Sequence, residues 1–144
     1  MAPSVSLIRE AEMGDLHAVV MGILALKQSG VWQTLPFVPN YQHVEAQVVM
    51  MLHQTSHRLF VAVDEAMVMG LCGVELVQQR FIPDLLFVLE WALWVRPERR
   101  GDGTGRDLWR TACAWGRAQG AHGSIRATPW AHGERLTMSM WEDT

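Results

Sequence analysis

A continuous apolar run from Leu85 to Val95 leads into a loop with three glycines and then into a helical pattern. Only Glu90 interrupts this run, which is typical of a strand at the centre of a sheet covered on both faces. The run is too short to cross a bilayer as a helix. Beyond the loop, Leu108, Ala112 and Trp115 recur at helical spacing. A buried strand joined to a helix by a glycine loop predicts an α/β domain, in which the helix crosses over to a second, parallel strand.

The rest of the chain supplies further strands and helices for this sheet. We expect strands at Ser4–Glu12, Leu59–Val63, Met67–Val77 and Ser124–Thr128, and helices capped by Asp15 and Asn40. Pro129 is expected to end the last of these strands. Leu136–Trp141 alternates like a strand, with a helix from Glu134 as the alternative. The order predicts a mixed α/β fold with a single central sheet, mostly antiparallel, one parallel strand pair and helices on both faces.

The length of 144 residues favours one domain, residues 1–144, with a core that needs no disulfide or metal. The net charge of -3 gives no general attraction to nucleic acid or to an anionic membrane, so an anion site must be local. Cys72 and Cys113 are expected to be buried free thiols in a reducing compartment. No secretory signal is recognisable, and we expect a cytoplasmic protein. The 6 histidines show no spacing typical of a metal site, so no metal is expected.

The glycine loop itself has the chemistry of an anion site. The N–H groups at a helix N-terminus lack partners inside the helix and carry partial positive charge. Glycine lets the backbone come close to a ligand, while Arg100 and Arg106 add charge. Arg100–Gly105, placed at the start of a helix, therefore has the composition of a pyrophosphate cradle. The alternative is a solvated glycine-rich turn beside a basic patch.

The motif Val95-x-Pro97-x-x-Arg100-Gly101-x-Gly103-x-Gly105-x-x-Leu108 resembles the acyl-CoA-binding motif of the GNAT N-acetyltransferases. The resemblance implies a GNAT-like fold in which the parallel strands splay apart, with a shortened C-terminus because few residues follow Thr128. It also implies acetyl-CoA, or another acyl-CoA, as co-substrate. The N–H groups that would hold its pyrophosphate belong to Arg100, Gly101, Asp102, Gly103, Thr104 and Gly105. Leu93, Trp94 and Val95 would pair with the pantetheine arm.

The reaction implied by this resemblance is direct transfer of the acyl group to a primary amine, of a small molecule or a peptide, in a ternary complex. Glu90 is the candidate base. In these proteins, however, the carboxylate frequently occupies the places held here by Leu89 and Trp91. A regular strand would turn Glu90 to the opposite face, unless a bulge restored it. The alternative role for Glu90 is that of a paired structural carboxylate.

Trp32, Phe37 and Tyr41 fall in the region that lines the acceptor side in the resembling proteins, and they are predicted to form an apolar acceptor pocket. The late tyrosine that many of these proteins use as an acid is missing. These departures leave open a second function, that of a catalytically weak or inactive binding or assembly protein with the same fold that retains CoA binding. An exposed sheet edge left by the short C-terminus would favour a homodimer.

Overall fold

The computed structural model of the protein describes residues 6–28, 36, 38–130 and 133–142. In chain order its strands and helices are β1 (Leu7–Glu10), α1 (Leu16–Lys27), α2 (Tyr41–Leu52), β2 (His57–Asp64), β3 (Met67–Gln78), β4 (Leu86–Val95), α3 (Thr104–Ala118), β5 (Gly123–Trp130) and β6 (Gly133–Met140). Two short 3-10 turns, η1 (Met13–Asp15) and η3 (Pro97–Arg99), precede α1 and α3. The predicted acceptor residues Trp32 and Phe37 lie outside the described residues.

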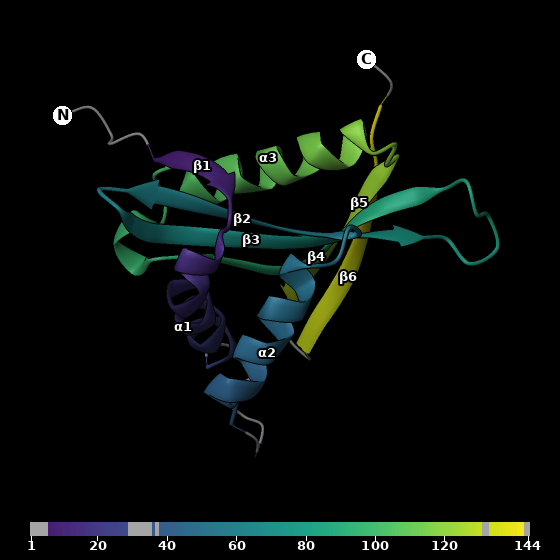
Figure 1. Ribbon diagram of the computed structural model, residues 1–144. Coiled ribbons are helices and arrows are strands. Elements are labelled where there is room, and N and C mark those ends of the chain that lie inside the picture. The colour runs from purple at the N-terminus through teal and green to yellow at the C-terminus, as the bar shows by residue number, and fades with distance from the viewer. Residues whose placement is uncertain (1–5, 29–35, 37, 131–132, 143–144) are drawn as a thin grey trace.

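The strands form one six-stranded sheet in the order β1-β2-β3-β4-β5-β6. Neighbouring strands are antiparallel except for β4 and β5, which are parallel and joined through α3. Figure 1 shows α3 on one face of the sheet and both α1 and α2 on the other. The prediction of a mixed sheet with one parallel pair and helices on both faces is confirmed.

Several local expectations are corrected by tertiary contacts. Asp15 starts α1 as predicted, but its carboxylate pairs with Arg9 at 2.7 Å and does not cap the helix. Asn40 does cap α2, because its Oδ1 accepts a hydrogen bond from the N–H of His43. Pro129 does not end β5, which continues to Trp130. In this part of the strand β6 is the only neighbour, and proline is tolerated at such edge positions.

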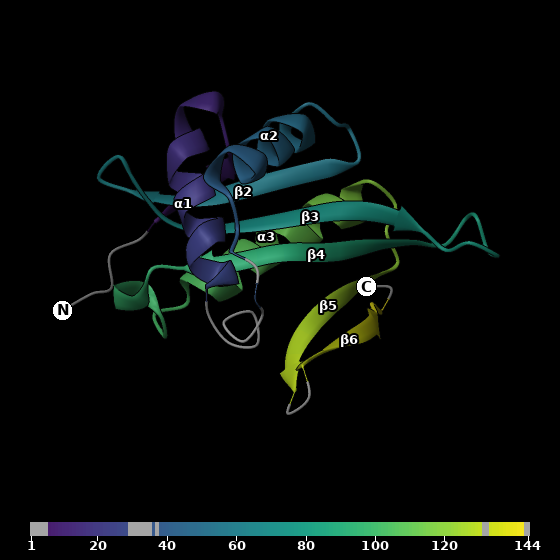
Figure 2. The same cartoon turned by 90° about the horizontal axis from the view of Figure 1, so that it is seen from below.

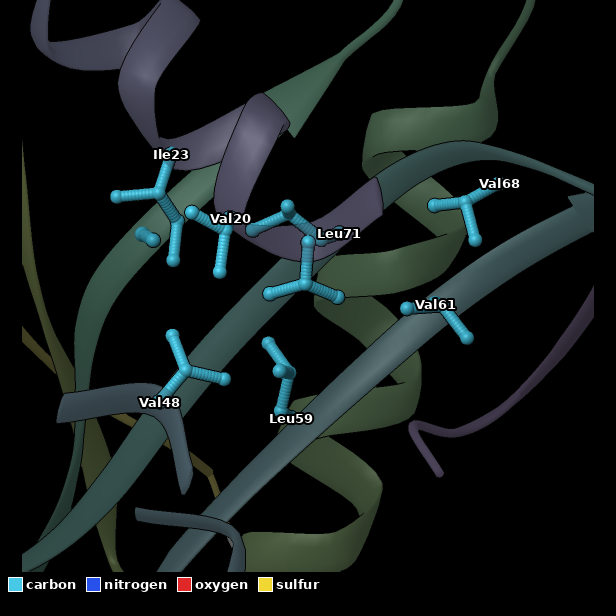
Figure 3. Close-up of a cluster of buried hydrophobic side chains, with 9 residues drawn as sticks. Val20, Ile23, Val48, Leu59, Val61, Val68 and Leu71 are labelled. Atoms are coloured by element: carbon cyan, nitrogen blue, oxygen red, sulfur yellow. The ribbon is translucent and has the colours of Figure 1, made fainter. Parts of the chain in front are cut away.

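Two layers of apolar side chains flank the sheet. The first core lies between the sheet and α1 and α2 (Figure 3), and its buried residues are Val19, Val20, Ile23, Val48, Leu59, Val61, Val68, Leu71 and Ala92. The second core lies under α3, and its buried residues are Phe60, Ala62, Cys72, Val74, Val88, Leu108 and Ala112. Both cysteines are free as predicted, but only Cys72 is fully buried and Cys113 is half-buried. Burial raises the pKa of each thiol, to about 11 for Cys113. Such thiols are poor nucleophiles at neutral pH.

A bulge interrupts the pairing of β4 with β3. Ala92 lies opposite Gly73, but Glu90 lies opposite Val74, so Trp91 is an extra residue on β4. The indole ring of Trp91 lies directly against Gly73, where a Cβ would have no room. Because of this extra residue, Trp91 and Ala92 both face the first core, while Glu90 shares the face of the second core with Leu93 and Val95.

Gly116 in α3 packs directly on Val88 of β4, and a Cβ at this position would overlap the side chain of Val88. We expect Gly116→Ala to lower the free energy of unfolding by about 1–3 kcal/mol, because overpacking of this buried contact outweighs the higher helix propensity of alanine. Urea unfolding followed by circular dichroism measures the change. Gly14→Ala is the matched control, since no atom lies within 4 Å of a Cβ built there. Equal stabilities of the two variants would contradict the close approach of α3 to the sheet.

Candidate functional site

Strands β4 and β5 form a fork. They are hydrogen-bonded only where Phe87–Leu89 lies beside Gly123–Ile125. Beyond these residues β5 turns away from β4 (Figure 2) and continues as a hairpin with β6. Among the residues that the structure describes, the part of β4 from Glu90 to Val95 therefore has β3 on one side and no strand on the other. An extended ligand can hydrogen-bond to such a free strand edge as an added strand would.

The predicted pantetheine residues Leu93, Trp94 and Val95 all lie on this unpaired part of β4. Leu93 and Val95 pack toward the second core and Trp94 toward the first, as alternation along a strand requires. The carbonyl of Val95 is already in use, because it accepts a hydrogen bond from Nε of Arg100 at 3.0 Å. This bond ties the loop to the end of β4.

The loop after β4 makes two turns that need glycine. Gly101 and Gly103 have φ angles of 87° and 95°, in the left-handed region where a side chain is strained. Gly103 is the residue that precedes the first turn of α3. Gly105 has ordinary helical geometry, and a Cβ there would make a normal contact of 3.4 Å with Val95. Two of the three glycines are thus required by the backbone, whereas the third keeps the space beside Val95 open.

Some of the predicted cradle N–H groups are bonded within the protein. Oδ1 of Asp102 accepts from the backbone N–H of Thr104 at 2.9 Å and from its hydroxyl at 2.6 Å. These bonds, with help from Arg99, hold the pKa of Asp102 below its usual range. The N–H groups of Arg100 and Asp102 donate to backbone carbonyls of the preceding turn. In the described part of the chain, the N–H groups of the three loop glycines have no acceptor.

The three loop glycines line a hollow of about 410 Å³ at the N-terminus of α3. Its lining residues are Val95, Arg99, Arg100, Gly101, Gly103, Gly105 and Arg106. Arg99 is a structural residue here, since it forms ion pairs with Asp64 and Asp102 and so joins the loop to the end of β2. Arg100 and Arg106 are exposed at the rim. Unpaired N–H groups, a helix N-terminus and two arginines together favour a polyanionic ligand.

Glu90 lies at the point where the fork opens, one residue beyond the last paired position of β4. Its carboxylate forms an ion pair of 2.9 Å with Arg126 of β5, and its side chain is only 10% exposed. The guanidinium of Arg126 also stacks on the ring of Trp109 at 4.3 Å. The bulge places Glu90 on the same face as Val95, and its pairing fits the structural role left open by the sequence.

Tyr41, a predicted acceptor residue, lies at the start of α2 and packs against the first core, and its hydroxyl is 2.8 Å from Nδ1 of His17.

A second carboxylate near the fork was missed by the sequence reasoning. Glu75 of β3 pairs with His57 of β2 at 2.7 Å. Counting back from the turn of this hairpin would misalign the two residues, because a bulge between Ala62 and Val63 shifts the register.

Among the described residues, no three His, Cys, Asp or Glu side chains lie together in a way that could hold a metal ion. Over the same residues, no helix is both long and apolar enough to cross a membrane.

A parallel strand pair that opens beside a glycine loop and a helix N-terminus is the arrangement of an acyl-CoA-dependent transferase. The chain belongs to the acetyltransferase (GNAT) family, whose model matches residues 22–134. Members of this family use acetyl-CoA as co-substrate. The family and the fold expected from the motif are therefore confirmed. No curated protein is similar enough to match the chain.

Solved structures share this fold. A putative acetyltransferase from Agrobacterium tumefaciens is 20% identical, with a TM-score of 0.71 over 87% of this chain and 83% of that chain. A GNAT family acetyltransferase from Staphylococcus aureus is 13% identical, with a TM-score of 0.69 over 98% of this chain and 99% of that chain. A ribosomal-protein-alanine N-acetyltransferase from Brucella melitensis is 19% identical, with a TM-score of 0.67 over 84% and 73%. At such identities the likeness concerns the fold alone.

The bonds from Thr104 to Asp102 give a test of how the loop is held. We expect Asp102→Ala to lower the free energy of unfolding by about 1 kcal/mol, because the first N–H of α3 loses its acceptor. Asp102→Asn keeps an acceptor oxygen and should lower it by less. The carboxylate of Asp102 has a lowered pKa when folded, so its contribution exists above about pH 4 and is lost as the pH falls through the folded pKa. Urea unfolding at pH 7 and pH 3 checks both points; an equal gap between the alanine variant and the wild type at both pH values would contradict them.

Proposed function

We propose that the protein is an N-acyltransferase that moves the acetyl group of acetyl-CoA to a primary amine by direct transfer in a ternary complex. The observation that carries this proposal is the pairing of two features at one place. The unpaired edge of β4 ends at Val95, and the hollow with the three unbonded glycine N–H groups begins at the same residue. Acetyl-CoA carries an extended pantetheine arm followed by a pyrophosphate. The arm would fit the open edge of β4, and the pyrophosphate would fit the hollow.

The glycine N–H groups of Gly101, Gly103 and Gly105 are proposed to bind the pyrophosphate, with Arg100 and Arg106 adding charge from the rim. The backbone of Leu93–Val95 would hold the pantetheine arm along the open side of β4. This arrangement directs the thioester toward the base of the fork, near Glu90. The donors of the cradle belong to the backbone, so they are fixed before the ligand arrives.

In the reaction, the amine nitrogen attacks the thioester carbonyl, the new C–N bond forms, and the C–S bond breaks. The proton of the amine passes to a base, and the departing thiolate takes up a proton. Glu90 stays the predicted base, since it lies at the opening of the fork. Its ion pair with Arg126 and its burial support the second candidate function, a weak or inactive protein that still binds CoA.

Acetyl-CoA binding is tested at Gly105, where a side chain meets no backbone strain. We expect Gly105→Glu to abolish binding, because its carboxylate would enter the hollow and repel the pyrophosphate. Gly105→Ala should still bind, since its methyl group only touches Val95. The measurement is the rise in melting temperature with acetyl-CoA, which for a ligand at 100 times its Kd corresponds to about 2.7 kcal/mol. If acetyl-CoA raises the melting temperature of Gly105→Glu as much as that of the wild type, the pyrophosphate does not bind at this loop.

The role of Glu90 is tested by Glu90→Gln. If Glu90 is the base, we expect turnover to fall about 100-fold or more, with acetyl-CoA binding unchanged and a loss of stability no larger than that caused by breaking the ion pair with Arg126. Thiol release from acetyl-CoA measures turnover, and thermal unfolding measures stability. Arg126→Gln is the matched control, since it breaks the same ion pair and leaves the carboxylate in place. Equal loss of stability in both variants, with turnover retained, would assign Glu90 to structure.

A further inference from the structure

Helix α3 carries a row of arginines on its outer side. Arg106, Arg110 and Arg117 are exposed, whereas Leu108 and Ala112 are buried against the sheet. At 3.6 residues per turn, the Cα–Cβ directions of the three arginines lie within about 40° of one another around the helix axis. We name these three residues the arginine stripe. They point away from the second core, along most of the length of the helix.

The arginine stripe is a local excess of positive charge on a chain whose net charge is -3. The one carboxylate of α3 belongs to Asp107, which lies 3.5 Å from Nε of Arg106. Among the residues that the structure describes, Arg110 and Arg117 form no ion pair. Both can therefore attract an anion outside the protein, and this attraction belongs to one face of the molecule.

Tryptophan rings stack on arginines at both ends of this face. Cζ of Arg117 lies 5.0 Å from the ring centre of Trp141, and Cζ of Arg126 of β5 lies 4.3 Å from that of Trp109. Both rings also pack against the second core, so they are fixed supports. A guanidinium held on such a ring loses little freedom when it donates to a phosphate, and a base can stack on its plane.

The side of β6 that faces α3 continues this polar surface. Thr137 lies opposite Arg126, which reaches α3, so Thr137 shares its face, and Arg135 and Ser139 follow by alternation. All three side chains of β6 are exposed. Helix α3 packs on β2, β3 and β4, and the described residues place no helix over β6 on this face (Figure 1). Guanidinium and hydroxyl donors thus extend from α3 to the edge of the sheet.

We propose that this face binds single-stranded nucleic acid. Arg110 and Arg117 bind phosphates, and the supported plane of Arg117 stacks on a base. An acidic polypeptide would match the charges, but it offers no row of planar groups for stacking. The bases of a duplex are already stacked on one another, so a single strand satisfies both features. DNA and RNA share these two features, and the inference does not depend on the acyltransferase function.

The experiment measures the fluorescence anisotropy of labelled oligo(dT) and oligo(U), each about 16 nucleotides long, with the intact chain. We expect Arg110→Gln and Arg117→Gln each to lower the affinity about tenfold, because one charged phosphate contact is lost. The slope of log Kd against log salt concentration should fall by about 0.7 for each lost contact. Arg80→Gln is the matched control, since it removes an equal charge from an exposed position between β3 and β4 and should leave the affinity unchanged.

Arg117→Lys separates stacking from charge. It keeps the charge and the salt dependence, but we expect a several-fold loss of affinity, because an ammonium group has no plane to stack on a base. Full affinity in this variant would overturn the stacking role of Arg117. Circular dichroism and the stabilisation by acetyl-CoA should match the wild type in every variant, since none of these residues belongs to the glycine loop.

The measurement is made with and without acetyl-CoA. Displacement of the oligonucleotide by acetyl-CoA would place the strand in the glycine loop and overturn the proposal. Wild-type affinity in both glutamine variants, or an equal loss in Arg80→Gln, would also overturn it. Poly-L-glutamate that competes as well as oligo(dT) would assign the face to an acidic protein partner. Equal affinity for a duplex of the same length would leave phosphate contacts alone and contradict the preference for a single strand.

Discussion

The short contact between β4 and β5 governs the rest of the site. Three residues of each strand hold the parallel pair together, and the remainder of each strand is free to diverge. Beyond the contact, Arg126 of β5 forms an ion pair with Glu90 of β4 and stacks on Trp109 of α3. These contacts hold the two strands in place where they begin to diverge. Strand β6 supplies the backbone partners that β5 no longer finds in β4. The backbone groups of β5 are thus satisfied without β4, and those on the open edge of β4 are left for a ligand or water.

The bulge at Trp91 decides which chemistry each face of the fork carries. It turns Glu90 toward α3 and leaves Leu89 and Trp91 on the side of α1 and α2. On that side Glu75 of the neighbouring strand lies directly opposite Leu89. A carboxylate beside the fork is thus present on both faces, one paired with an arginine and one with a histidine. The two carboxylates differ in exposure, since the side chain of Glu90 is 10% exposed and that of Glu75 is 32% exposed.

In the loop at the start of α3, side chains make the contacts that hold the loop, and the backbone supplies the unbonded N–H donors. Arg99 forms ion pairs with Asp64 of β2 and with Asp102, and Asp102 accepts a hydrogen bond from the first turn of α3. These contacts join the loop to both elements. The positive φ angles of Gly101 and Gly103 let the chain turn twice within a few residues. What remains unpaired is a set of backbone donors at the positive end of a helix. The donors of the proposed cradle therefore belong to the backbone and do not depend on flexible side chains.

The sequence by itself determined the strand before the glycine loop and the crossover helix after it, since apolar periodicity depends on local geometry. The family was indicated by the resemblance of the glycine motif to the acyl-CoA-binding motif. It also located the unpaired stretch Leu93–Val95 and the arginines of the hollow. Only the tertiary structure decided which N–H groups of the loop stay unbonded, that Arg99 is structural, and that Glu90 faces α3. It alone brought Glu75 beside Leu89, because two bulges set the register between strands. Gly70 and Gly73 lie at these bulges, but a glycine in a strand does not tell which residue is the extra one. Side-chain direction in a sheet depends on the pairing of distant segments, and that pairing forms only when both cores pack.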